Sequence, residues 1–170
     1  MTDAIRSAIE GASAYVTAHP DEARYTDSLA TATLGEGLRV RVEGPNGERL
    51  DTDMPGAVGG AGSAPSPGWF LRAAVASCVA SLARMRAAQI GLHGFAGSVD
   101  VDSLSDDRGI LGVEATVPAG PLSMRIRFRV TADGVDPARL REVAEWAADH
   151  CPVSDAVRRA VPLRVEVVSQ

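Results

Sequence analysis

The segment from Ser66 to Gly91 constrains the fold of this chain more than any other, because it joins a helix start, a long apolar series and a helix stop. Ser66 suits the N-cap, where its hydroxyl accepts from an unpaired backbone N–H, and Pro67 suits the first helical position, where a missing N–H costs nothing. Small and apolar residues then continue on nearly every side through Ile90, and Gly91 is a suitable C-cap. A helix that is apolar all round is typical of a buried position, so we expect a central helix here.

The residues before this helix predict a shorter helix and a hairpin. Apolar residues recur at helical spacing through the first 18 positions and His-Pro ends the pattern, so residues 1–20 are interpreted as an amphipathic N-terminal helix, distinct from a main domain of residues 21–170. Strands are predicted at 25–33 and 38–43, followed by a GPNGE turn and a continuation toward Leu50.

Three segments after the central helix show the alternation of a half-buried strand. They are FAGSVDV at 95–101, ILGVEATV at 110–117 and LSMRIRFRV at 122–130. The turn sequences between them predict an antiparallel meander with one face in water.

The C-terminal part predicts two helices and a last strand. One helix starts at Pro137, a shorter one at Cys151-Pro152, and LRVEVV at 163–168 reads as the closing strand. Helices and strands do not alternate as βαβ units, which favours the α+β class with helices packed on antiparallel sheet.

Composition and charge exclude several classes of function. The chain has 170 residues and a formal charge of −5 without long runs of one sign, which argues against nucleic-acid or membrane partners. No apolar run of about 18 residues lacks charges, and no signal segment opens the chain. We therefore expect a soluble, cytoplasmic protein, in which two cysteines are free or redox-active.

The two cysteines occupy different local settings. Cys78 lies about three turns inside the central helix among apolar neighbours, where burial raises a thiol pKa, and its activation would need a nearby arginine. Cys151 occupies a predicted N-cap, which favours a thiolate and lies nearer solvent. Their separation of 73 positions does not say whether they meet, so packing and chemistry both stay open.

Two motifs together resemble the OsmC/Ohr family of osmotically induced and organic-hydroperoxide-resistance proteins. They are PSPxxxLxAAxASC in the central helix and CPVS near the C-terminus, and the resemblance covers about residues 25–170. It implies an intertwined α+β homodimer with buried central helices and active sites at the interface. The N-terminal helix is an addition that only some members carry.

The resemblance also implies a role for each thiol. Cys78 matches the peroxidatic cysteine, whose thiolate attacks an organic hydroperoxide to give a sulfenic acid, and Cys151 matches the resolving cysteine. The resulting disulfide is reduced by an external dithiol, without a cofactor. Because no CxxC or HxxxH pair is present, we expect no metal either.

The sequence departs from the family at the start of the central helix. Its characterised peroxidases carry a glutamate one or two positions after the proline, where this chain has Gly68 and Trp69. That glutamate holds an arginine from the N-terminal strands, for which the candidates are Arg39, Arg41 and Arg49. Glu48 or Asp51 are the available substitutes for the missing acid.

The departure keeps two alternatives open. One is a non-peroxidatic member that binds a small apolar or sulfur-containing ligand at the dimer interface; the absent acid favours it and the retained cysteine pair disfavours it. The other is a pair of purely structural thiols, which would resist alkylation in the folded protein.

Overall fold

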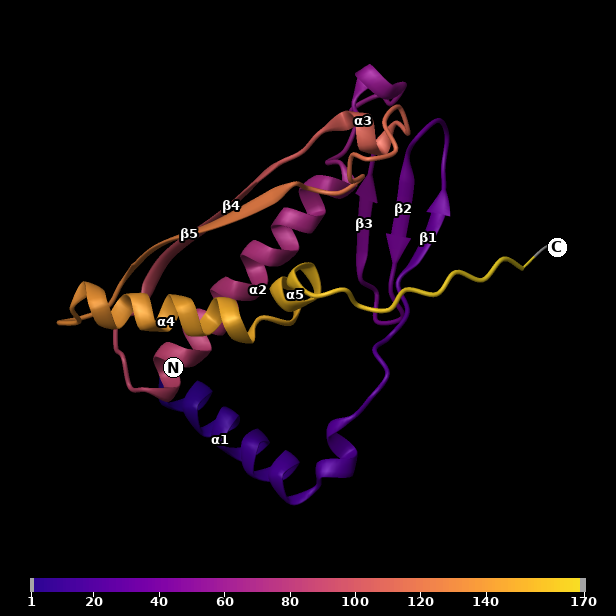
Figure 1. Ribbon diagram of the computed structural model, residues 1–170. Coiled ribbons are helices and arrows are strands. Elements are labelled where there is room, and N and C mark those ends of the chain that lie inside the picture. Colours follow the sequence, from indigo (N-terminus) through magenta and orange to yellow (C-terminus); the bar gives the residue numbers. More distant parts are fainter. Residues whose placement is uncertain (1, 169–170) are drawn as a thin grey trace.

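The computed structural model describes residues 2–168 and has the α+β architecture that the sequence predicts (Figure 1). Two antiparallel sheets, with strand orders β1-β2-β3 and β4-β5, accompany the helices. The helices and strands are α1 (Thr2–Ala18), β1 (Thr31–Leu34), β2 (Val40–Glu43), β3 (Arg49–Thr52), α2 (Pro67–Gln89), β4 (Ala96–Leu104), α3 (Asp107–Ile110), β5 (Ser123–Thr131), α4 (Pro137–His150) and α5 (Pro152–Arg158), with 3-10 turns at Pro20–Ala23 and Gly56–Val58.

The central helix α2 begins and ends as predicted. The Ser66 hydroxyl accepts from the Trp69 N–H at 3.3 Å, Pro67 is the first helical residue, and Gly91 follows the helix in the left-handed conformation (φ 77°). Burial differs from the prediction, because only one side of α2 is covered within one chain. Its buried residues are Val75, Val79, Ala83, Ala87 and Ala88. The opposite side, which includes Ser77 and Ser81, is exposed.

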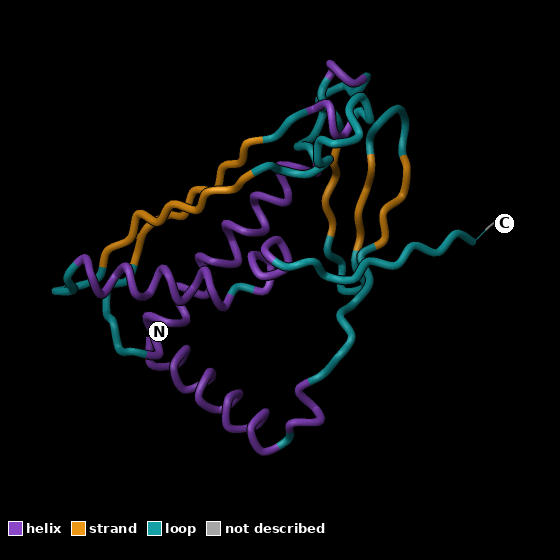
Figure 2. The backbone as a smooth tube through the Cα atoms, in the orientation of Figure 1, coloured by secondary structure: helices purple, strands orange, loops and turns teal. Residues whose placement is uncertain are grey.

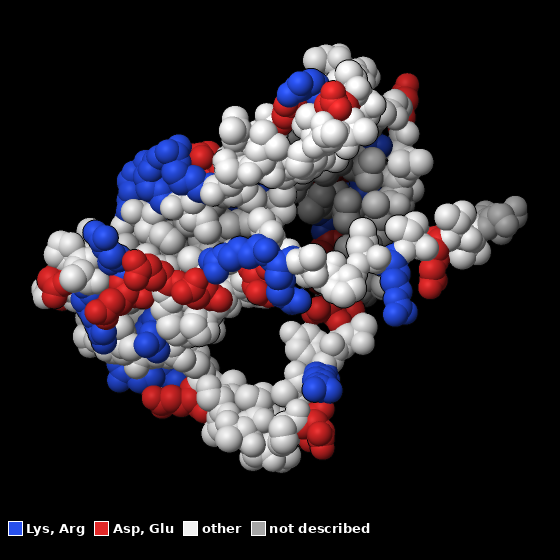
Figure 3. Space-filling view, viewed as in Figure 1, with Lys and Arg blue, Asp and Glu red and all other residues white. Residues whose placement is uncertain are grey.

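The β4–β5 hairpin lies across α2 and confirms the alternation predicted for β5 (Figure 1). Its inward side chains are Met124, Ile126, Phe128 and Val130. Its outward arginines pair with aspartates of β4: Arg125 Nη2 lies 2.6 Å from Asp102, and Arg127 and Arg129 both reach Asp100. Basic side chains therefore gather over the outer face of the hairpin (Figure 3).

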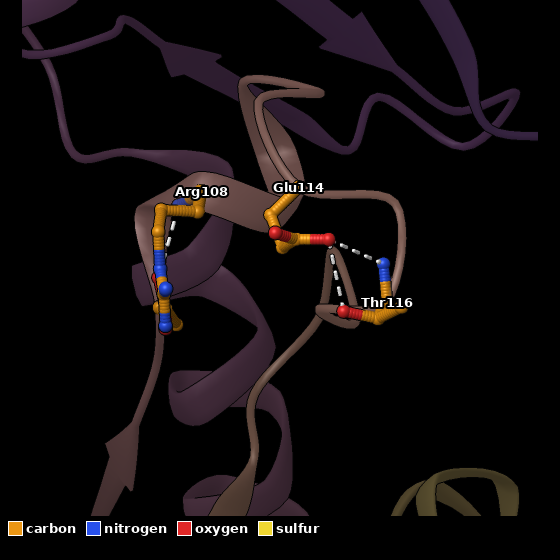
Figure 4. A network of polar contacts seen from close by, with 4 residues as sticks. Arg108, Glu114 and Thr116 are labelled. Atoms are coloured by element: carbon orange, nitrogen blue, oxygen red, sulfur yellow. Dashed lines mark hydrogen bonds and ion pairs between the residues drawn. The ribbon is translucent and has the colours of Figure 1, made fainter.

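The strand predicted at 110–117 is wrong. Asp106 accepts from the Arg108 N–H at 3.0 Å and caps the short helix α3, after which Glu114 accepts from the N–H and hydroxyl of Thr116 at 3.4 and 3.0 Å (Figure 4). Local turns occupy the backbone that a strand ladder would use: the N–H groups of Leu111, Val113 and Val117 donate to backbone carbonyls three to five residues earlier. The expected three-strand meander is therefore a two-strand hairpin.

Two other strand predictions also need correction. Of residues 25–33 only the last three are in β1, which starts at Thr31 and pairs with four residues of β2. Residues 163–168 run extended from the body (Figure 1) and, within the part of the chain that the structure describes, join no sheet. A segment with alternating apolar residues becomes a strand only where a neighbouring strand can pair with it, and the described residues of one chain place none beside this tail. Leu163 and Val167 are accordingly 90% and 91% exposed.

The core is made by α2, α4, α5 and the β4–β5 hairpin, with α1 docked at the end of α2. Arg6 Nε of α1 donates to Ala88 O at 2.9 Å and so satisfies a carbonyl of the last helical turn of α2. The β1–β3 sheet stands beside this body, separate from the helices (Figure 2). None of the helices in residues 2–168 has both the length and the apolar character needed to cross a membrane.

Candidate thiol site

The fold brings the two cysteines together. Cys78 of α2 and Cys151 at the start of α5 pack in one apolar cluster with Val75 and Val79, and both are free thiols. Cys78 is half-buried, whereas Cys151 is 0% exposed. The sequence did not say whether the two thiols meet; in the fold they are neighbours, although they are 73 positions apart.

The turn between α4 and α5 holds Cys151 in place. Helix α4 ends at His150, and Pro152 restarts a helix at once, so that Cys151 is extended (φ −77°, ψ 117°) and serves as the N-cap of α5, as predicted. The Ser154 N–H donates to Cys151 Sγ at 3.4 Å, and the Ser154 hydroxyl donates to Ala148 O at 2.6 Å. Ser154 thus ties α5 to α4.

Two points about this turn differ from the sequence analysis. The expectation that a cap position lies nearer solvent is wrong here, because α2 and the hairpin cover Cys151 completely. Ser154 is a further residue of the site that the sequence patterns above did not predict. Its position three residues after an N-cap was the available signal, since that is where a capping side chain meets a backbone N–H.

The pKa values of the two thiols shift in opposite directions. Burial raises the pKa of Cys78, and the hydrogen bond that its thiol donates to Cys151 raises it further. Burial also raises the pKa of Cys151, but the hydrogen bonds from Cys78 and from the Ser154 N–H outweigh it, and the net shift is downward. In one chain at rest, the first thiolate therefore forms on Cys151.

This inequality predicts a split thiol titration. Thiolate absorbance at 240 nm should rise in two steps as the pH increases, the first of them below the ordinary thiol range, because the first proton leaves Cys151, whose pKa is lowered. Cys78→Ala should leave only the step of Cys151. That step should move to a higher pH than in the wild type, because Cys151 loses the hydrogen bond from Cys78 while it stays buried. A single step in the wild type at the ordinary pKa would contradict the hydrogen bond between the thiols.

A cavity of about 420 Å³ opens beside the thiols, between α2, α5 and the start of β5. It shares Val75, Met124 and Ile126 with the cluster that contains the cysteines. Leu71, Val75 and Cys78 follow one another at four and three residues and so lie on one face of α2, of which the first two line the cavity. Cys78 does not line the cavity itself but lies about one turn further along this face of α2.

The candidate arginines lie on the separate β1–β3 sheet. Within the described residues of one chain, Arg39, Arg41 and Arg49 form no hydrogen bond or ion pair with either thiol. Arg41 Nε is 3.1 Å from Asp51 Oδ1, across the register that pairs β2 with β3. Asp51, one of the two acids that could replace the missing glutamate, thus binds Arg41, one of the three candidate arginines.

The other acidic candidate and the glycine are placed differently. Glu48 accepts from Asn46 at 2.9 and 3.0 Å and so closes its own turn. A Cβ at Gly68 would fit without a clash, in ordinary contact with Arg72 Nη1 at 3.9 Å and Ser66 Oγ at 4.0 Å. In residues 2–168, no group of three His, Cys, Asp or Glu side chains is placed to hold a metal ion.

Comparisons with known proteins agree with this architecture. The family model described as OsmC-like protein matches residues 60–166. The organic hydroperoxide resistance protein of Xanthomonas axonopodis pv. citri is 32% identical over 143 residues, which cover 83% of this chain and 92% of that protein.

Solved structures share the fold at lower sequence identity. An organic hydroperoxide resistance protein OsmC from Legionella pneumophila gives a TM-score of 0.57 at 23% identity over 79% of this chain and 91% of that one. An OsmC-like protein from Mycoplasma pneumoniae gives 0.64 at 13% identity over 81% and 91%.

Proposed function

The chain belongs to the family of OsmC-like proteins, and on this premise we propose that it is a cysteine-based peroxidase that reduces organic hydroperoxides. The observation that carries the proposal is the contact between Cys78 and Cys151, beside an apolar cavity. Cys78 is the peroxidatic and Cys151 the resolving cysteine. The relative from Xanthomonas, named for resistance to organic hydroperoxides, supports this substrate class.

The bonds that change during the oxidation belong to the two thiols and the peroxide. The Cys78 thiolate attacks the terminal oxygen of the hydroperoxide; an S–O bond forms, the O–O bond breaks, and the alkoxide leaves as an alcohol after taking a proton. The Cys151 thiolate then attacks the sulfenic sulfur; an S–S bond forms and water leaves. An external dithiol returns the disulfide to two thiols by exchange.

The unequal pKa values fit these roles. A resolving cysteine attacks as a thiolate, and the N–H of Ser154 favours that form at Cys151. Cys151 is fully buried, whereas Cys78 is half-buried, so Cys78 is the thiol that is more accessible to a peroxide. The Cys78 thiol needs one more cation nearby to lose its proton, which the resting chain does not supply.

We assign that cation to Arg41 of a second copy in an intertwined homodimer. Three features of one chain support the dimer: α2 is covered on one side only, the β1–β3 sheet stands apart from the helices, and the tail at 163–168 has no partner strand in the described structure. Leu34 at the end of β1 is 86% exposed, as expected of a surface that a partner covers.

Arg41 is preferred over the other two arginines because it is already oriented by a carboxylate. Asp51 accepts from its Nε at 3.1 Å, which leaves the terminal nitrogens free to face a thiolate and a peroxide. Asp51 would thus do from β3 what the family's glutamate does from the central helix, where this chain has Gly68.

The stoichiometry of a single turnover tests the proposal. Pre-reduced protein mixed with an excess of cumene hydroperoxide, without reductant, should consume one equivalent of peroxide per chain and lose both thiols. Consumption of peroxide without loss of thiols, or no consumption, would exclude the two-cysteine reaction.

The second candidate function is ligand binding without peroxide chemistry. The absent acid at Gly68 and the apolar lining of the cavity favour a small apolar or sulfur-containing ligand. This alternative requires that both thiols stay reduced in peroxide while the ligand still binds, so the same experiment separates the two functions.

A further inference from the structure

We propose that Asp53 is a positioning residue for Arg41, because it fixes the β1–β3 sheet relative to the start of helix α2. The inference rests on the proposed peroxidase function and adds to it a residue that acts through Arg41. It depends on the burial of the Asp53 side chain, on the hydrogen bonds that this side chain accepts, and on the place of its loop between the sheet and α2.

The Asp53 side chain is a buried charge without a cation. Asp53 follows the last residue of β3 and is 1% exposed, and among the described residues it is the only acidic or basic one that is buried. None of the ion pairs in this part of the chain includes it. A carboxylate in such a place is costly in free energy unless hydrogen-bond donors occupy its oxygens.

Hydrogen bonds from its own loop take the place of a cation. Asp53 Oδ1 accepts from the Met54 N–H at 2.8 Å, and Oδ2 accepts from the N–H and the hydroxyl of Ser63 at 2.9 and 2.8 Å. The bonds from Ser63 outweigh burial and hold the pKa of Asp53 below its ordinary value, so the side chain is ionised at neutral pH. A movement of the loop that breaks these bonds would leave a buried charge unpaired, and such movements are therefore disfavoured.

The loop of Asp53, residues 53–65, is the structured connection between the sheet and α2. It begins where β3 ends and leads directly into Ser66, the N-cap of α2. The Asp53 N–H donates to Pro65 O at 3.3 Å, which closes the loop at its base. The other link to the sheet, residues 24–30 before β1, is exposed and forms neither helix nor strand. Since the sheet stands apart from the helices (Figure 2), the loop of Asp53 sets the angle between the sheet and α2.

The sheet carries this constraint to Arg41. Asp51 lies two residues before Asp53, and it accepts from Arg41 Nε at 3.1 Å across the register of β2 and β3. A change at Asp53 therefore moves Asp51 and Arg41 together relative to α2. In the proposed dimer, α2 carries Cys78 and the sheet carries the arginine that faces this thiol in the second copy, so the angle decides whether the two groups meet. A shift of about 1 Å at a reacting group can lower a rate a hundredfold.

The test replaces Asp53 by asparagine, which keeps the size of the side chain and removes its charge. An amide has one acceptor oxygen, so its NH₂ group faces the donor of Met54 or those of Ser63, and the loop is released. Asp53→Asn should lower the second-order rate constant for cumene hydroperoxide about tenfold in single turnovers of pre-reduced protein. Combined with Arg41→Ala, it should lower the rate no further, because the residue through which it acts is gone. A further tenfold fall in that background, or an unchanged rate in the single variant, would overturn the inference.

The titration of Cys78 separates positioning from a loss of stability. In a Cys151→Ser background, which removes the titratable neighbour of Cys78, the rate of alkylation by iodoacetamide against pH reports the Cys78 thiolate alone. Asp53→Asn should raise the midpoint of this curve by about one pH unit, as Arg41→Ala should, because a cation that moves away no longer favours the thiolate. Ser66→Ala is the matched control: it removes the N-cap of α2 next to the same loop and should keep the midpoint.

Ser63→Ala provides the answer if Asp53→Asn does not fold. It keeps the carboxylate and removes one of its three donors, so a smaller rise of the midpoint is expected. A midpoint that stays unchanged in every variant that folds, or that rises equally in Ser66→Ala, would overturn the inference. Failure of the proposed function appears differently, as no consumption of hydroperoxide by the wild type, whereas the alkylation curve still reports whether Asp53 acts on Cys78.

Discussion

Replacing Cys78 by serine is expected to lower the rate of peroxide consumption at least a hundredfold and to prevent loss of the remaining thiol. A serine hydroxyl is not ionised near neutral pH, and the nucleophile in this chemistry is the anion. The other thiol, Cys151, is 0% exposed, so it does not replace Cys78 as the group that meets the peroxide. Stopped-flow mixing of pre-reduced protein with cumene hydroperoxide measures the rate.

The matched variant is Cys151→Ser. It should still react once with peroxide and then stop at a sulfenic acid on Cys78, which dimedone labels. Because the pKa of Cys151 is the lowered one, the two variants must also be checked for the reverse assignment, in which Cys151 attacks the peroxide. If Cys151→Ser lost the first reaction and Cys78→Ser kept it, the roles of the two cysteines would be exchanged.

Replacing Arg41 by alanine is expected to lower the same rate about a hundredfold. Loss of one charged donor aimed at the reacting atoms typically costs that much. Here the thiol of Cys78 would also keep its raised pKa, because burial and the bond to Cys151 are no longer opposed. Arg39→Ala and Arg49→Ala are the controls, since they remove the same charge nearby and neither residue pairs with Asp51 in the described structure.

A mixed dimer shows which chain supplies the arginine. If the chain forms the proposed homodimer, co-expression of Arg41→Ala with Cys78→Ser should produce mixed dimers in which one site combines an intact Cys78 with the partner's intact arginine. Activity well above that of either variant alone is expected if the arginine acts across the interface. No recovery would place Arg41 and Cys78 of the same chain together, and full activity of Arg41→Ala would remove this arginine from the mechanism.

The elements that the sequence predicts well are those with local signals. The Ser66-Pro67 start and the Gly91 end of α2 depend on backbone groups within a few residues, and the alternation in β5 reports one covered face. The N-cap role of Cys151 is of the same kind. In each case the physical cause lies within one or two turns of the residue concerned.

The predictions that fail depend on partners that a pattern does not name. Residues 110–117 alternate like a strand, yet their backbone N–H groups bond to nearby carbonyls in turns that follow the capped helix α3. Residues 163–168 alternate as well, and whether they pair depends on a neighbouring strand that one chain lacks. The contact between Cys78 and Cys151, and the cover over the latter, likewise depend on how distant elements pack.

Mapping the disulfide after one equivalent of peroxide tests the central claim most directly. Protein treated with cumene hydroperoxide is alkylated, digested without reduction and analysed by mass spectrometry. The peroxidase proposal predicts a peptide pair joined by a Cys78–Cys151 bond within one chain. Two alkylated cysteines after prolonged exposure, or bonds only between chains, would contradict it.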